Sequence, residues 1–325
     1  MSSVRIAGTG LSIPQKILSN ADLEKMVDTS DEWIRTRTGI AERRIAAPDV
    51  ASSDMGYEAA VRAMHDAGIV SEDIDAIVVA TATPDYQFPS TACLIQSRLG
   101  AKRAFAFDIS AGCAGFVYAL KVGKTMIDAG NAETVLLVGA ETMSRVTDYE
   151  DRTTCILFGD GAGAVVLAKS EMPGILSISL GSDGDAWQLL YMPGGGSRIP
   201  ATEESVRQRH HYLKMQGSDV FKEAVKAMES ASIEAIRKAE ITPDEIDLFI
   251  SHQANYRIME AVRRRLDIPP EKVFMNVDRY GNTSSASVPI ALDEAAKSGK
   301  IQRGDIILFS AFGAGFTWGA AVVRW

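Results

Sequence analysis

The chain has few cysteines and no long apolar run, and both absences limit what it can be. Only three of its 325 residues are cysteines, and they fit neither a metal-binding spacing nor a paired disulfide framework: Cys93, Cys113 and Cys155. We therefore expect a reducing compartment, the cytoplasm, and no bound metal. No apolar stretch approaches the roughly 20 residues that span a bilayer, so we expect no membrane partner.

An excess of positive charge is also missing. The 34 Lys and Arg residues are outnumbered by 42 Asp and Glu residues, which gives a formal net charge of −8. This balance argues against a nucleic-acid partner. Residues 1–14 are typical of a first strand and turn rather than of a signal peptide. The hydrophobic content of 46% and charged content of 23% are ordinary for a globular protein.

Short runs rich in Val, Ile and Ala alternate with helical patterns along the chain. The strand-like runs are apolar on both faces and lie at 74–81, 134–140, 162–168, 246–251 and 305–312. Helical patterns lie near 52–67, 90–99, 114–129, 218–239, 256–266 and 285–298. Strands without a polar face are typical of a buried, mostly parallel sheet covered by helices. We therefore predict an α/β protein.

The chain also repeats itself. Three pairs of segments match in the same order: 73–83 with 245–255, 107–115 with 276–284, and 157–167 with 310–323. The second match places Gly112-Cys113 on Gly281-Asn282, and the third places residues 161–163 on 313–315. We therefore predict two related halves, 1–172 and 173–325. Side chains at matching strand ends would then face one cleft.

Cys113 is the first candidate for chemistry. It follows a strand-like stretch, lies in the small-residue turn AGCAG and precedes a helical pattern. The unsatisfied N–H groups and positive dipole at a helix start favour the thiolate, which is the nucleophilic form. Gly112 and Gly115 would let a reacting carbonyl approach the backbone. The alternative is a buried cysteine that acts as a small hydrophobic residue.

His252 and Asn282 are its candidate partners in the second half. His252 ends an apolar strand-like run, and Asn282 follows a turn glycine before a helical pattern. A nucleophilic cysteine with a distant histidine and asparagine is a known catalytic grouping. Taken alone, His252 could be a satisfied core histidine, and Asn282 could be a turn or N-cap residue.

These motifs together resemble one known family. The segments 27–40, 88–96, 108–116, 158–167, 251–258, 281–287 and 312–325 are similar to β-ketoacyl-acyl carrier protein synthase III, an initiating condensing enzyme of the thiolase-like superfamily. The resemblance implies a five-layer αβαβα fold, a homodimer and no metal, nicotinamide or flavin. It implies that Cys113 takes an acyl group, acetyl or another short primer, from acyl-CoA. Malonyl-acyl carrier protein would then condense with it.

The resemblance also assigns roles to individual residues. The backbone N–H groups of Cys113 and Ala314 would form the oxyanion hole, and His252 and Asn282 would donate to the thioester oxygen of the malonyl group. CoA would contact Thr29, Trp33, Arg37, Arg152 and Asn255, whereas Ser218 lies where some relatives carry asparagine. Phe88 would close the partner's acyl pocket, which Met143, Phe158, Leu190 and Leu213 would line. Without the resemblance, Trp33 also fits helix packing, and Met143, Phe158, Leu190 and Leu213 also fit plain core.

Docking of an acidic carrier protein requires a local basic patch. The resemblance assigns this role to Lys222 and Arg257, near the arginine run 263–265, which could equally be a solvated helix face. The segment 184–214 is expected to help cover the site. His210 and His211 lie in it, and we expect both to be exposed and to bind no metal.

Several other functions fit these residues less well. A thiolase would carry a second cysteine near 313–319, elongating condensing enzymes use two histidines, and plant-type polyketide synthases are longer. A dinucleotide-binding oxidoreductase is suggested by the glycines at 8–10 and 159–164, but neither run completes the required fingerprint. The closest alternative is a condensing enzyme of secondary metabolism with another starter or acceptor.

Overall fold

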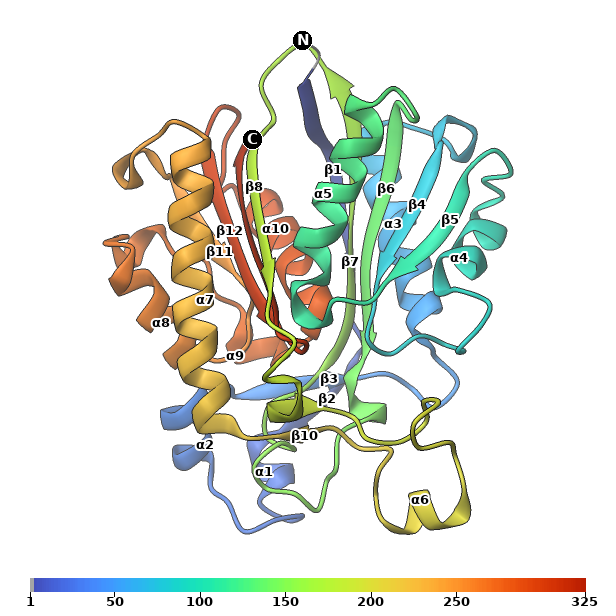
Figure 1. The fold of residues 1–325 in the computed structure, drawn as a ribbon, viewed down its shortest axis with the longest axis vertical. Coiled ribbons are helices and arrows are strands. Elements are labelled where there is room, and N and C mark those ends of the chain that lie inside the picture. The colour runs from blue at the N-terminus through green and yellow to red at the C-terminus, as the bar shows by residue number, and fades with distance from the viewer. Residues whose placement is uncertain (1–2) are drawn as a thin grey trace.

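Two β-sheets form the framework of the computed structural model, which describes residues 3–325 (Figure 1). The first sheet has the order β1 (Ser3–Ser12), β7 (Asp160–Ser170), β6 (Thr134–Thr142), β4 (Ala76–Ala80), β5 (Phe105–Ile109). The second has the order β11 (Leu248–Ser251), β12 (Ile306–Gly313), β13 (Thr317–Arg324), β8 (Ile175–Ser182). The predicted first strand is present from Ser3, and Met1 and Ser2 lie outside the described residues.

Helices cover both faces of each sheet. Between the sheets lie α5 (Gly115–Asp128) and α10 (Ser287–Lys297), which share one apolar cluster with both sheets. The outer face of the first sheet carries α3 (Ser52–Ala67) and α4 (Thr91–Leu99), and that of the second carries α7 (Gly217–Lys238) and α8 (Tyr256–Arg265) (Figure 1). The predicted five-layer αβαβα arrangement is confirmed.

The sheets are mixed, so the prediction of mostly parallel strands was wrong. Parallel pairing joins β4 to β5, β4 to β6, and β11 to β12. The pairs β1–β7, β6–β7, β12–β13 and β13–β8 are antiparallel. Apolar residues on both strand faces report burial by two helix layers, and this burial does not depend on strand direction.

Glycines on the first sheet let elements of the second half sit directly on it. A Cβ at Gly139 would lie 2.6 Å from the carbonyl oxygen of Ser285, and one at Gly163 would lie 2.6 Å from the backbone nitrogen of Ile290. Ser285 belongs to the 3₁₀ turn η7 (Ser284–Ala286), and Ile290 belongs to α10. The halves are therefore interlocked through backbone contacts.

The structure changes the register of the predicted repeat. Cys113 lies in the 3₁₀ turn η2 (Gly112–Ala114) before α5, and η7 stands in the same way before α10. Gly112 and Ser284 open these turns with φ of 51° and 50°. Cys113 therefore corresponds to Ser285 rather than to Asn282. The third match was also out of register, because residues 161–163 lie in β7 whereas Gly313 ends β12.

Smaller elements gather at one end of the molecule, the lower end in Figure 1. They are β2 (Lys16–Ser19), α1 (Asn20–Leu23), α2 (Asp31–Thr38), β3 (Glu42–Ile45), β9 (Leu190–Tyr191), α6 (Glu203–Arg207), β10 (Lys214–Met215) and α9 (Val277–Tyr280). Within residues 3–325, the structure has no helix long and apolar enough to cross a membrane.

Candidate active site

Cys113 lies where the two halves meet. Its turn η2 contacts both η7 and the end of β12. The thiol donates to the hydroxyl oxygen of Ser284 at 3.4 Å. The neighbouring Gly115 packs on β4, because a Cβ there would lie 3.1 Å from the Cβ of Ala80. The nucleophile predicted from the first half therefore faces a turn of the second.

The turn after β12 packs against the backbone of η2. A Cβ at Gly112 would lie 2.7 Å from the nitrogen of Ala314. The hydroxyl of Thr317 donates to the carbonyl oxygens of Ala111 and Ala314, at 2.7 and 3.1 Å, and so links the two segments. The structure therefore brings the backbone nitrogens of Cys113 and Ala314 into one small region, as an oxyanion hole requires.

His252 follows β11 and is buried, with 3% of its surface exposed. Its backbone N–H donates to the carbonyl of Ser310, and its Nδ1 lies 2.6 Å from the hydroxyl oxygen of Ser287. Desolvation lowers the pKa of His252 to about 3, so the imidazole is neutral near pH 7. A neutral ring can donate one hydrogen bond, which suits the predicted role.

Asn282 lies between α9 and η7 and is held by β-bridge pairing with Phe158. Its N–H donates to Leu157 at 2.8 Å, and its carbonyl accepts from Gly159 at 3.0 Å. The side-chain Oδ1 accepts from the N–H of Ser284 at 2.8 Å. The amide Nδ2 is therefore the end of the side chain that remains to donate to a ligand.

The prediction that the helix start would favour the thiolate of Cys113 was wrong, because burial disfavours the charged form. Desolvation raises the pKa of the Cys113 thiol to about 12, and the charge of Glu141 acts in the same direction. The hydrogen bond with Ser284 lowers this pKa by less than burial raises it. The resting nucleophile is a thiol, so its proton must leave during attack.

Glu141 was missed by the sequence analysis, although it organises the site. This fully buried carboxylate at the end of β6 accepts from the hydroxyls of Thr83 and Ser285 at 2.6 and 2.7 Å, and from the N–H of Ala82 at 3.0 Å. Burial raises its pKa, and these hydrogen bonds oppose the rise. Ser285 follows Ser284, so Glu141 ties the turn that touches Cys113 to the first sheet.

The residues expected to contact CoA gather around α2 and the segment after β6. The guanidinium groups of Arg152 and Arg37 lie 5.1 and 5.8 Å from the ring centroid of Trp33. Arg152 also pairs with Asp28 at 3.4 Å. The hydroxyl of Thr29 is buried without a hydrogen-bond partner, which suits a ligand contact.

Asn255 caps α8 by accepting from the N–H of Arg257 at 2.8 Å, which leaves its amide nitrogen free of that contact. Ser218 lies exposed in the first turn of α7. An adenine placed between Trp33 and Arg152 would have to separate the two side chains, because they now stack on one another.

The residues expected to line the acyl pocket are apolar neighbours. Met143 and Phe158 are buried in one cluster, Leu190 is buried in another, and Leu213 packs against both. Phe88 does not join them, because it is 87% exposed.

The predicted docking residues lie on the neighbouring helices α7 and α8. The guanidinium of Arg257 lies 5.8 Å from the ring centroid of Phe221, the residue before Lys222. The arginine run is largely neutralised, because Arg263 and Arg264 pair with Glu260 and Arg265 pairs with Glu229.

The prediction that His210 and His211 would be exposed was wrong. Both are half-buried with a buried Nδ1, His211 stacks 4.0 Å from Tyr212, and His210 packs against Gly194. Among residues 3–325 no cluster of His, Cys, Asp and Glu has the arrangement of a metal site.

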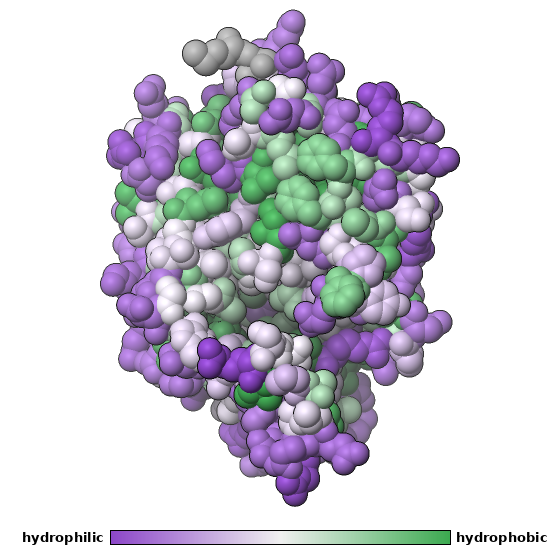
Figure 2. All heavy atoms as spheres, turned by 45° about the vertical axis from the view of Figure 1, so that its right-hand side comes forward, coloured by the Kyte–Doolittle hydropathy of each residue, from purple (hydrophilic) through white to green (hydrophobic). Residues whose placement is uncertain are grey.

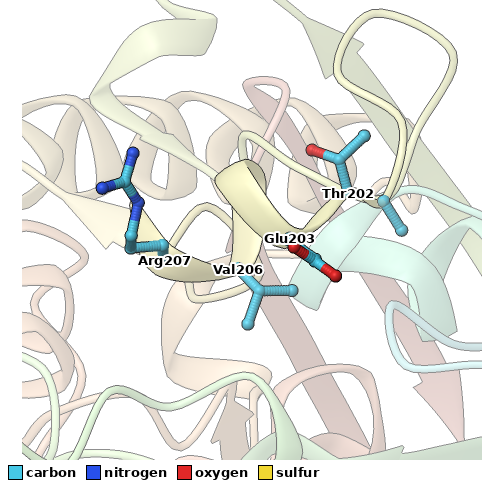
Figure 3. Close-up of a pocket in the computed structure, with 5 residues that line it drawn as sticks. Thr202, Glu203, Val206 and Arg207 are labelled. Carbon is cyan, nitrogen blue, oxygen red and sulfur yellow. The ribbon is translucent and has the colours of Figure 1, made fainter.

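A shallow hollow over α6, shown in Figure 3, is lined by residues 201–203, Val206 and Arg207. None of the proposed catalytic side chains lines this hollow.

Two interlocked sheets, with Cys113 in the turn before the central helix α5 and His252 and Asn282 in the second half, are typical of an acyltransferase of thiolase-like fold. Residues 107–184 match the family model of 3-oxoacyl-[acyl-carrier-protein (ACP)] synthase III, and residues 236–325 match the model of its C-terminal part. The β-ketoacyl-[acyl-carrier-protein] synthase III of Caldanaerobacter subterraneus subsp. tengcongensis is 56% identical over 321 residues, which cover 98% of this chain and 97% of that protein.

Solved structures agree with these matches. The crystal structure of 3-oxoacyl-[acyl-carrier-protein] synthase III from Aquifex aeolicus VF5 has a TM-score of 0.92 and 48% identity, covering 99% of this chain and 100% of that one. The priming β-ketosynthase of the R1128 polyketide biosynthetic pathway has a TM-score of 0.92 and 37% identity, covering 99% and 96%. The chain belongs to the 3-oxoacyl-[acyl-carrier-protein] synthase III family and is a condensing enzyme of that type.

Proposed function

We propose that this enzyme condenses a short acyl group from acyl-CoA with malonyl-acyl carrier protein and releases 3-oxoacyl-acyl carrier protein, CoA and CO₂. The contact of the Cys113 thiol with the η7 turn, together with the packing of the Cys113 backbone against the Ala314 turn, carries this proposal. It offers a nucleophile together with backbone donors for the oxyanion that forms when a thioester is attacked.

In the first half-reaction the Cys113 sulfur attacks the thioester carbon of acyl-CoA. The carbonyl oxygen becomes an oxyanion, which the N–H groups of Cys113 and Ala314 stabilise. The carbon–sulfur bond to CoA then breaks, and the thiol proton ends on the CoA sulfur. The product is an acyl-Cys113 thioester, and no oxidant or metal enters the balance.

In the second half-reaction the malonyl thioester loses CO₂, and negative charge develops on its thioester oxygen. The Asn282 amide and the neutral His252 ring donate to this oxygen, and decarboxylation itself removes no proton. The enolate carbon then attacks the acyl-Cys113 carbonyl, the bond to sulfur breaks, and the thiolate regains a proton from solvent. The depressed pKa of His252 supports a donor role rather than that of a strong base.

The substrate contacts follow from the same arrangement. Thr29, Trp33, Arg37 and Arg152 would hold the nucleotide end of CoA, and Asn255 its pantetheine arm. The buried unpartnered hydroxyl of Thr29 and the stacked Trp33 support this assignment. We also propose no resident cofactor and, because the three cysteines are free, a cytoplasmic location.

We propose that two copies of the chain pair through β5. This strand ends the first sheet and pairs with β4 alone in the described part of the chain. Phe88, Tyr86 and Phe105 are exposed by 87%, 61% and 47%. Figure 2 shows apolar surface on the side that carries β5 and α4 in Figure 1. An unpaired edge beside exposed aromatic residues suits a second identical edge, which would bring Phe88 to the partner's acyl pocket.

Sedimentation equilibrium tests this pairing. We expect the wild type to sediment as a dimer and Phe105→Lys to sediment as a monomer. A wild-type monomer at micromolar concentration would contradict the proposal.

Reconstitution tests the overall reaction. Purified enzyme, malonyl-acyl carrier protein and acetyl-CoA should yield a 3-oxoacyl-carrier protein by mass spectrometry, and Cys113→Ala should yield none. A panel of longer acyl-CoAs then addresses the second candidate, a condensing enzyme of secondary metabolism, which the similarity to the R1128 priming synthase supports. Acetyl-CoA should be preferred if the buried Met143 and Phe158 keep the pocket short. Preference for a longer starter would favour the second candidate.

A further inference from the structure

Ser287 touches His252 on the side of the ring that the proposed chemistry does not use. Ser287 is the first residue of α10, and 1% of its surface is exposed. Its hydroxyl oxygen lies 2.6 Å from Nδ1 of His252. Ser287 closes the segment 281–287, and the resemblance implies no role for it.

The same hydroxyl has a second neighbour, which bears on the direction of the bond. The N–H of Gln253 donates to the Ser287 oxygen at 3.3 Å. Among the hydrogen bonds of residues 3–325, the Ser287 hydroxyl has no other partner than this N–H and Nδ1 of His252. Since an N–H cannot accept, the hydroxyl hydrogen of Ser287 has an acceptor among these neighbours only if Nδ1 of His252 carries no proton.

We propose that Ser287 is a positioning residue that donates to Nδ1 of His252 and thereby holds the imidazole in the tautomer that carries its proton on Nε2. In the opposite tautomer two N–H groups would share one oxygen, and the Ser287 hydrogen would be buried without an acceptor. A buried polar group left without a partner costs about 1–3 kcal/mol. With the proton on Nε2, the Gln253 N–H, the Ser287 hydroxyl and the His252 Nδ1 each have a hydrogen-bond partner.

Neighbouring hydrogen bonds hold this unit rigidly. The Gln253 side chain donates to the carbonyl of Ser251 at 2.9 Å and to that of Phe274 at 3.2 Å, and its oxygen accepts from the N–H of Asn276 at 3.0 Å. The N–H of His252 donates to Ser310 at 2.7 Å. The ring plane and the tautomer are therefore set before substrate binds, which is the condition for strong stabilisation of a developing charge.

The inference rests on the proposed function for its consequence, because only Nε2–H can donate to the oxygen of the decarboxylating thioester while Nδ1 faces Ser287. Acylation of Cys113 depends instead on the backbone N–H groups of Cys113 and Ala314, with which the Ser287 hydroxyl forms no hydrogen bond. The two half-reactions should therefore respond differently when Ser287 is changed.

Nitrogen-15 NMR of the histidine-labelled, substrate-free protein tests the tautomer without requiring any activity. The chain has only four histidines, so the His252 signals are identified by their loss in His252→Asn. We expect a protonated Nε2 and an unprotonated Nδ1 in the wild type, and a mixture of tautomers in Ser287→Ala. A wild-type ring protonated on Nδ1, or an unchanged tautomer in Ser287→Ala, would overturn the proposal.

Kinetics of Ser287→Ala and Ser287→Thr test the consequence. Loss of the hydroxyl should lower kcat for malonyl decarboxylation about 10- to 100-fold, with KM and the rate of Cys113 acylation little changed. Ser287→Thr should restore most of the rate. Ser298→Ala is the matched control, because Ser298 follows the same helix and its hydroxyl bonds only the carbonyl of Ala295. Equal losses in both half-reactions would indicate a merely structural serine and contradict the role.

If the wild type decarboxylates no malonyl thioester, the proposed function fails, whereas the NMR result still decides whether Ser287 sets the tautomer.

Discussion

Gly313 packs directly against the backbone of Cys113. A Cβ added to Gly313 would lie 2.3 Å from the Cys113 nitrogen, closer than any real contact. The obstacle is backbone rather than a flexible side chain, so the turn that carries Ala314 would have to move. The separation of the two proposed oxyanion donors thus depends on a residue without a side chain.

Gly313→Ala should therefore impair acylation while leaving the fold in place. Misplacing one donor of an oxyanion hole costs about 10²- to 10³-fold in rate. We expect a loss of this size in the rate of acyl-enzyme formation, measured by quenched-flow mass spectrometry. Gly196→Ala is the control, because a Cβ there would meet open space. If Gly313→Ala forms the acyl-enzyme at the wild-type rate, the position of the Ala314 turn does not affect acylation.

Removal of Glu141 should destabilise the protein. Glu141→Ala leaves the buried hydroxyl of Thr83 and the N–H of Ala82 without their acceptor, whereas the Ser285 hydroxyl keeps the carbonyl of Ala80 at 2.7 Å. A buried group left without its partner costs about 1–3 kcal/mol. We expect the thermal midpoint to fall by about 5 °C or more, with a smaller fall for Glu141→Gln and none for the exposed Glu171→Ala. A midpoint unchanged in Glu141→Ala would contradict the bridging role.

Burial of neutral His252 should make folding stability depend on pH. The pKa of His252 falls from about 6.5 in the unfolded chain to about 3 in the folded protein. Between these values the unfolded chain binds a proton that the folded protein does not, so stability falls as pH falls. From pH 7 to pH 5, His252→Gln should lose about 2 kcal/mol less than the wild type.

Urea unfolding at the two pH values measures this difference. His65→Gln is the control, because His65 is exposed on α3. Equal pH dependence in the wild type and His252→Gln would show that His252 is protonated in the folded protein.

Charge reversal at Lys222 and Arg257 should weaken the binding of malonyl-carrier protein but not the reaction with acyl-CoA. Both side chains are exposed on the neighbouring helices α7 and α8, and an acidic partner would meet opposite charge there. We expect Lys222→Glu and Arg257→Glu to raise KM for malonyl-carrier protein about 10-fold and to leave acylation by acyl-CoA unchanged. Lys300→Glu, at an exposed position after α10, is the control. If both variants keep wild-type kinetics, docking occurs elsewhere.

Much of the fold could be predicted from the sequence, because apolar periodicity reports burial. It indicated the strands and helices and the helix layers on both sides of the sheets. Strand direction was predicted wrongly, since residues such as Val165 in β7 are buried whether their neighbours run parallel or antiparallel. The repeat was detected, but its register was not, because Gly112 and Ser284 share a conformation rather than a residue type.

The candidate site could be predicted only for residues that lie in recognisable local motifs. Cys113, His252 and Asn282 each follow a strand or turn that short motifs reveal. The roles of Glu141, Ser284 and Ser287 could not be predicted, because each depends on a contact between residues far apart in the chain. The charge state of Cys113 was also beyond the sequence, since the helix start is local whereas desolvation depends on the surrounding fold.

Intact-mass spectrometry after incubation with acyl-CoAs of increasing length tests the central claim most directly. The account predicts a stable acyl adduct on the wild type, located on Cys113 by peptide mapping, and no such thioester on Cys113→Ser. An adduct on Cys93 or Cys155, or none from any acyl-CoA, would contradict Cys113 as the nucleophile that opens the reaction.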